Sequence, residues 1–131
     1  MTQISTDKKK INDISYEVIG CAFKVHRELG PGLLESSYEA CLFYELSQSG
    51  LIVQRQKELP LIYEEVKLDA GYRIDLIVEN QLIVEIKSVE AIAPIHKAQI
   101  LTYLKLSKIK LGLLINFNNV NLQQGIHRLI L

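Results

Sequence analysis

The chain has 131 residues, of which 48% are hydrophobic and 23% charged. This balance fits one globular domain and excludes an intrinsically disordered protein. Fifteen Lys and Arg residues match fifteen Asp and Glu residues, so the formal net charge is zero, which excludes a broadly basic nucleic-acid-binding surface and leaves only a local basic patch for a phosphate-bearing partner.

The N-terminal residues show no targeting signal. Residues 1–10 have no apolar core behind their lysines, so we expect a flexible N-terminal segment there and a single domain over residues 11–131. No apolar run approaches the roughly 18 residues that a membrane span requires. A cytoplasmic protein with no membrane contact is therefore expected. Cys21 and Cys41 lack the spacing of a zinc pair and the density of a disulfide framework, which predicts buried free thiols.

Two amphipathic helices are predicted in the first part of the chain. Apolar residues recur at three- and four-residue steps over residues 11–29, and a Gly-Pro-Gly sequence at residues 30–32 ends the pattern. A second stripe of apolar residues with helical spacing runs over about residues 33–48. It is followed by Gly50, a residue typical of a helix C-terminus. The helical part of the chain is expected to end there.

Beyond residue 50 the chain consists of short apolar or alternating segments with turn residues between them. Five antiparallel strands are predicted, at residues 51–58, 61–63, 66–68, 71–78 and 82–87. Pro94 is well placed to begin a third helix that extends to about residue 107. The apolar segment 110–117 is typical of a strand buried on both faces, and a right-handed crossover would place it parallel to a neighbouring strand. Residues 126–131 are predicted to add an edge strand.

Three charged residues, Asp75, Glu85 and Lys87, interrupt the apolar strands of the hairpin predicted in mid-chain. Glu85 and Lys87 share one strand face because they are two residues apart. A three-residue turn at residues 79–81 would place Asp75 directly opposite Glu85. Opposed residues have Cβ atoms roughly 4.5 to 5.5 Å apart, so both carboxylates could share a divalent ion that relieves their repulsion. The alternative is an exposed ion-pair ladder, worth roughly 0 to 1 kcal/mol.

Polar residues on two predicted helices could join this hairpin. Gln99 and Tyr103 are spaced i and i+4, so they share one helix face, and either a substrate role or a structural role explains them. Glu35 stands in the first turn of the second helix, where stabilisation by the helix dipole is sufficient to explain it. Lys87 would project beside a metal-bound water, which its amine could position or deprotonate.

Four segments, in the same order along the chain, resemble one protein family. They are GLLESSY at residues 32–38, LDAGYRID at 68–75, EIK at 85–87 and HKAQILTYL at 96–104. On these motifs the chain is identified as a member of the GxxExxY protein family, in the PD-(D/E)xK nuclease-like superfamily. The resemblance implies an α/β (α+β) fold with a restriction-endonuclease-like core, in which helices flank a mixed central β-sheet.

The resemblance also implies a site for phosphodiester hydrolysis that depends on Mg²⁺ or Mn²⁺. Its catalytic residues would be Glu35, Asp75, Glu85 and Lys87. Asp75 and Glu85 would bind the metal together with the backbone carbonyl of Ile86, and Lys87 would serve the attacking water. Glu35 would orient water or help to hold a second ion.

The resemblance extends to the helix after the hairpin and to the function. Gln99 and Tyr103 resemble the Gln-x-x-x-Tyr element of exonuclease-like members and would position the substrate. Ile74 replaces the proline of the superfamily motif, a position that supplies no metal ligand. The expected function is hydrolysis of DNA or RNA by a metal-activated water, with nucleic acid held by a local basic patch. Two alternatives stay open: a non-catalytic module that binds nucleic acid or protein, and a hydrolase of small phosphate esters. A homo-oligomer also stays open.

Overall fold

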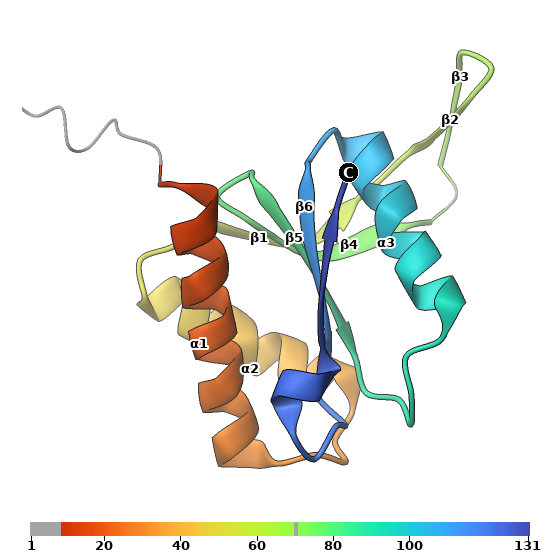
Figure 1. Cartoon of the computed structure of the whole chain (residues 1–131). Helices are drawn as coiled ribbons and strands as arrows, with labels where there is room; N and C mark the ends of the chain where they lie inside the picture. Colours follow the sequence, from red (N-terminus) through yellow and green to blue (C-terminus); the bar gives the residue numbers. More distant parts are fainter. Residues whose placement is uncertain (1–8, 70) are drawn as a thin grey trace, which may run out of the picture.

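The computed structural model describes residues 9–69 and 71–131 (Figure 1). The flexible segment predicted at residues 1–10 lies outside the described residues, apart from Lys9 and Lys10. None of the described helices combines the length and the apolar character that a membrane crossing requires. Cys21 and Cys41 are free thiols, as the sequence predicts, but they are half-buried and not fully buried.

The described residues form three α-helices where the apolar periodicity predicts them. They are α1 (Ile11–Leu29), α2 (Glu35–Gln48) and α3 (Pro94–Ser107). The first turn of α2 follows a loop that the Tyr38 hydroxyl closes: it donates a hydrogen bond to the carbonyl oxygen of Gly30 at 2.5 Å and accepts one from the N–H of Leu33 at 3.1 Å. Because this loop extends to Leu34, α2 begins at Glu35 instead of at about residue 33.

The strands also follow the predicted order, with small differences at their ends. They are β1 (Val53–Glu58), β2 (Leu61–Tyr63), β3 (Val66–Leu68), β4 (Arg73–Val78), β5 (Leu82–Lys87), β6 (Leu111–Asn116) and β7 (Ile126–Ile130). A short 3₁₀-helix, η2 (Leu122–Gly125), precedes β7. The first predicted strand is two residues shorter than expected because Leu51 is buried in the core before the sheet begins.

Five strands form one mixed sheet in the order β1-β4-β5-β6-β7. β5 and β6 are parallel and joined through α3, whereas the other neighbouring pairs are antiparallel. β2 and β3 form a separate two-stranded hairpin that projects from the body of the protein (Figure 1). The mixed central sheet with flanking helices confirms the fold class that the sequence predicts.

The sheet separates two apolar layers. α1 and α2 cover one face and α3 covers the other (Figure 1). Alternate residues of β5 divide between the layers: Val84 and Ile86 pack toward α1 and α2, whereas Ile83 packs toward α3. Tyr38 stacks on Phe117 with ring centroids 4.7 Å apart, which fixes α2 against the end of β6. The helices are therefore held rigidly on both sides of β4 and β5, where the charged residues lie.

Candidate functional site

β4 and β5 separate at the point where the predicted carboxylates stand. Their paired residues run from Val78 and Leu82 at the turn to Leu76 and Val84, which confirms the register expected from a three-residue turn. Asp75 and Glu85 are the next residues on the two strands. The ladder of backbone pairs ends before them, so the strands open into a fork there.

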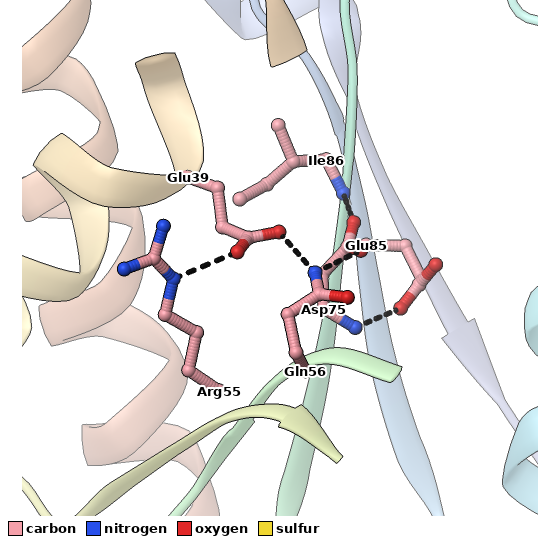
Figure 2. Close-up of polar contacts among 6 residues, drawn as sticks. All are labelled: Glu39, Arg55, Gln56, Asp75, Glu85 and Ile86. Atoms are coloured by element: carbon pink, nitrogen blue, oxygen red, sulfur yellow. Dashed lines mark hydrogen bonds and ion pairs between the residues drawn. The ribbon is translucent and has the colours of Figure 1, made fainter. Parts of the chain in front are cut away.

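The two carboxylates bridge this fork (Figure 2). The Glu85 Oε2 accepts a hydrogen bond from the backbone N–H of Asp75 at 2.8 Å. The Asp75 Oδ2 accepts one from the backbone N–H of Ile86, also at 2.8 Å. Each carboxylate thus satisfies an N–H of the opposite strand, which holds both acids between the strands and leaves each with a second oxygen.

Both carboxyl groups have raised pKa values because they are withdrawn from water. Glu85 is 4% exposed, and burial together with the neighbouring Asp75 charge raises its pKa to about 8. Burial, helped by the Glu39 charge, raises the pKa of Asp75 to about 6 against the opposing effect of its hydrogen bond from Ile86. A positive charge beside two such neighbouring carboxyl groups would stabilise their ionised forms.

Lys87 supplies positive charge near the two carboxyl groups, since it lowers the pKa of both. It is half-buried and lies two residues from Glu85, on the same strand face. The ion pairs in the described part of the chain are Lys24–Glu45, Arg55–Glu39 and Arg73–Glu58. Because none involves Lys87, its ammonium group is available to another partner beside the carboxylates.

Glu35 is exposed in the first turn of α2. It lines a hollow of about 370 Å³ with Ser88, the residue that follows Lys87. The Ser88 hydroxyl donates a hydrogen bond of 2.6 Å to the carbonyl oxygen of Leu33, which ties the start of α2 to the end of β5. The charge of Glu35 raises the pKa of Asp75, so it lies within electrostatic reach of the fork.

Gln99 and Tyr103 lie together on α3, as their spacing predicts. Both line one hollow, in which Gln99 is half-buried and Tyr103 is 5% exposed. Burial raises the pKa of Tyr103 to about 12, and the charges of Glu85 and Asp75 add to the effect. The phenol therefore lies within electrostatic reach of both carboxylates.

Sequence reasoning missed a second group of residues that supports Asp75 from the α2 side (Figure 2). The Gln56 side-chain amide donates hydrogen bonds to Glu39 Oε1 at 2.7 Å and to Asp75 Oδ1 at 3.3 Å. Arg55 Nε donates one to Glu39 Oε2 at 2.8 Å. Glu39 was detectable in principle, because it lies four residues after Glu35 and so on the same helix face.

The oxygen atoms at the fork fit a hard divalent cation. Among the described residues no three His, Cys, Asp or Glu side chains are grouped to hold a metal ion. Mg²⁺ does not need such a group, because it keeps several waters and binds through one or two carboxylates. The carbonyl of Ile86 adds a further oxygen, since N–H and C=O of one strand residue point to the same edge and the N–H of Ile86 points to Asp75. An all-oxygen donor set favours Mg²⁺ or Mn²⁺.

The raised pKa values predict that metal-free protein loses stability as the pH rises. The folded state keeps the protons of Asp75 and Glu85 to a higher pH than the unfolded chain does. The resulting stabilisation is complete only below pH 3.8, the ordinary pKa of Asp75, and is lost progressively up to about pH 6 for Asp75 and about pH 8 for Glu85. We expect the Tm of the metal-free protein to fall by several degrees between pH 5 and pH 8.5.

Glu85→Gln is the matched variant for this measurement, because its amide oxygen can still accept the Asp75 N–H but cannot ionise. Its Tm should depend less on pH than that of the wild type. Parallel pH profiles of Tm for the two proteins would show that Glu85 does not titrate in this range.

One comparison identifies a relationship to known proteins. A protein-family model described as the PD-(D/E)XK nuclease superfamily matches residues 12–129. No curated protein and no solved structure matches the chain. The matched residues include all five strands of the central sheet up to Leu129 in β7, and they contain the carboxylates at the fork, Lys87 and the polar residues of α2 and α3.

Proposed function

The chain belongs to the PD-(D/E)XK nuclease superfamily, and from that membership we propose that it is a metal-dependent nuclease of DNA or RNA, of the GxxExxY type indicated by residues 32–38. The observation that carries the proposal is the pair of withdrawn carboxylates, Asp75 and Glu85, at the fork between β4 and β5. Such a pair is costly to keep charged without a cation. A lysine stands beside it on the same strand.

The metal would be held by Asp75, Glu85 and the backbone carbonyl of Ile86. When bound, Mg²⁺ or Mn²⁺ would supply Lewis-acid chemistry to the phosphate and make water a stronger nucleophile. The buried position of Glu85 and the half-buried position of Asp75 limit the access of bulk water to one side of the site. The hydrogen bonds from Asp75 and Ile86 N–H groups fix the orientation of the two acids before a substrate arrives.

The side chains around the carboxylates would act on the water and the substrate. Lys87 Nζ would position the attacking water or stabilise the charge that develops on a phosphate oxygen. Glu35, at the rim between α2 and Ser88, would orient water or help to hold a second ion. Gln99 and Tyr103 would position the substrate from α3, and a local basic patch would hold its flanking phosphates.

The function is tested with purified protein and a panel of single-stranded, double-stranded and flapped DNA and RNA oligonucleotides. We expect cleavage of at least one substrate with Mg²⁺ or Mn²⁺ and none with a chelator. Binding without turnover, unaffected by chelator, would instead indicate a non-catalytic module. Hydrolysis confined to nucleotides and small phosphate esters would indicate a small-molecule phosphate-ester hydrolase instead of a nuclease.

Gln56 provides a prediction about the support of the site. Gln56→Ala removes the amide that connects Glu39 with Asp75, so Asp75 loses one of its two hydrogen bonds and Glu39 loses a donor. Losing a partner that orients a metal ligand commonly lowers metal affinity roughly 10- to 100-fold. Calorimetric titration with Mn²⁺ measures this effect directly.

Gln54→Ala is the control for this variant. Gln54 is an exposed residue of β1, two positions before Gln56, and it makes no side-chain hydrogen bond within the described part of the chain. Its replacement should leave Mn²⁺ affinity unchanged. Equal affinities for the Gln56→Ala and Gln54→Ala proteins would remove Gln56 from the site.

A further inference from the structure

A hollow of about 290 Å³ is lined by residues of α3, β2 and the segment that leads into β4. We call it the tyrosine hollow, after Tyr72 and Tyr103 in its wall. Leu61 and Ile95 contribute apolar surface, and Gln99 contributes an amide. Its volume is just below the roughly 300 to 1,000 Å³ of pockets for drug-sized ligands, so it suits a single ring system.

Tyr72 gives the hollow an accessible aromatic wall. Its ring meets Tyr103 edge to face, with centroids 6.3 Å apart and planes at 61°. Tyr72 remains 43% exposed, while its backbone carbonyl is held by a 2.9 Å hydrogen bond from the N–H of Leu59. An aromatic side chain on an anchored backbone, partly open to solvent, is the kind of surface on which nucleobases stack.

Tyr103 connects the hollow with the proposed catalytic site. It lines the hollow and packs in one apolar cluster with Ile83, which lies two residues before Glu85 on the same face of β5. Tyr72 lies three residues before Asp75 on the same segment of chain. A group bound in the hollow would therefore lie next to a phosphate held at the carboxylates.

The positive charges next to the hollow suit a polyanionic nucleic-acid chain. Arg73 follows Tyr72, and Lys97 precedes Ala98 of the hollow wall; both are exposed. Arg73 pairs with Glu58, but that pair is exposed on both sides and is easily exchanged for a phosphate. An apolar hollow with cations at its border fits a base with flanking phosphates better than it fits an apolar peptide.

We propose that the tyrosine hollow binds one unpaired nucleobase adjacent to the phosphate that is cleaved. This proposal rests on the proposed nuclease function and specifies its substrate. The base would stack on Tyr72, and its edge would hydrogen-bond to the Gln99 amide. A base inside a duplex has both faces stacked and its pairing edge occupied, so the preferred substrate is single-stranded nucleic acid or an unpaired end.

The test measures binding in the presence of a chelator, so that it does not depend on cleavage. Fluorescence anisotropy is recorded with a labelled single-stranded 12-mer, the same 12-mer with abasic sites, and the matched duplex. We expect the single strand to bind more tightly than both other probes. Tyr72→Ala should weaken its binding about 5- to 150-fold, the range measured for losing one stacked base, while Tyr72→Phe should retain it.

Tyr44→Ala is the matched control. Tyr44 is an exposed tyrosine of α2 that lines another hollow, of about 250 Å³, among residues of α1 and α2. Its replacement should leave single-strand affinity unchanged. Equal affinities of wild type and a folded Tyr72→Ala protein would overturn the proposal, and so would a duplex bound as tightly as the single strand.

The two proposals fail in distinguishable ways. Metal-dependent cleavage that does not respond to Tyr72→Ala would keep the nuclease function and overturn base binding in the hollow. Base-dependent binding without cleavage in Mg²⁺ or Mn²⁺ would support base binding in the hollow and overturn the nuclease function. A dimer in light scattering that Tyr72→Ala dissociates would show a second copy of the chain in the hollow, which also overturns base binding.

Discussion

Asp75→Asn is expected to abolish detectable Mn²⁺ binding and to lower metal-dependent cleavage at least about 10³-fold, equivalent to about 4 kcal/mol of transition-state stabilisation. The substitution removes one of the two charged oxygens proposed for the metal. The asparagine oxygen can still accept the N–H of Ile86, so the fork should keep its shape. The loss of activity would therefore come from the charge and not from unfolding.

The same substitution should stabilise the metal-free protein at neutral and alkaline pH. Asp75 raises the pKa of Glu85, and removing its charge relieves that repulsion. A higher Tm with lower activity is the signature of a functional site that is kept at the expense of stability. Asp13→Asn, an exposed residue of α1, serves as the control: it should leave activity unchanged and should lower the Tm slightly, because Asp13 stands in the first turn of the helix. An Asp75→Asn protein that cleaves at the wild-type rate would exclude Asp75 from catalysis.

Lys87→Ala is expected to lower the rate of cleavage roughly 10²- to 10⁴-fold, the usual range for the loss of a group that transfers a proton or stabilises charge in the transition state. Metal affinity should be retained or increased, because the ammonium group lies near both carboxylates and repels a cation there. The two variants therefore differ: Asp75→Asn loses metal and activity together, whereas Lys87→Ala loses activity alone.

Rates at saturating Mn²⁺, combined with calorimetric affinities, separate these cases. Lys110→Ala, at an exposed position just before β6, provides the control for a lost lysine charge. Equal losses of metal affinity and rate in the Lys87→Ala protein would mean that Lys87 holds the fork together and does not act on the substrate.

The register of the β4–β5 hairpin was predictable because it depends on local features. The apolar alternation of each strand fixes which residues share a face, and a three-residue turn at residues 79–81 fixes the pairing. Glu79 and Asn80 adopt left-handed backbone angles, with φ of 54° and 56°, as a tight turn requires. The alternation of side chains along each strand and the length of the turn together placed Asp75 and Glu85 side by side, without knowledge of the rest of the fold.

The fork itself was not predictable from the hairpin pattern. A regular ladder would leave the N–H groups of Asp75 and Ile86 to backbone partners, whereas the two carboxylates accept them. Gln56 could not be found either, because its reach to Glu39 depends on α2 packing near β1. Its φ of 53° inside a strand is unusual for a residue other than glycine, and such strain is characteristic of functional sites.

The contacts of a buried asparagine at the end of β6 were not predictable from the sequence either. Asn116 of β6 is fully buried, and its side-chain amide donates hydrogen bonds to the Val89 carbonyl and to Asn119 Oδ1, both at 2.9 Å. Its Oδ1 accepts the N–H of Val89 at 3.0 Å. These bonds fix the loop that follows Lys87 and Ser88. The apolar pattern of residues 110–117 predicted the strand but not this connection between two distant segments.

The most direct test of the proposed metal site is a crystal of the protein soaked in Mn²⁺, with anomalous scattering recorded at the manganese absorption edge. The proposal predicts one anomalous peak bounded by the carboxylates of Asp75 and Glu85 and the carbonyl of Ile86, with oxygen distances of about 2.0 to 2.2 Å. The peak should be missing from crystals of the Asp75→Asn protein. No peak at the fork at a Mn²⁺ concentration well above that needed for activity, or a peak only elsewhere, would contradict the account.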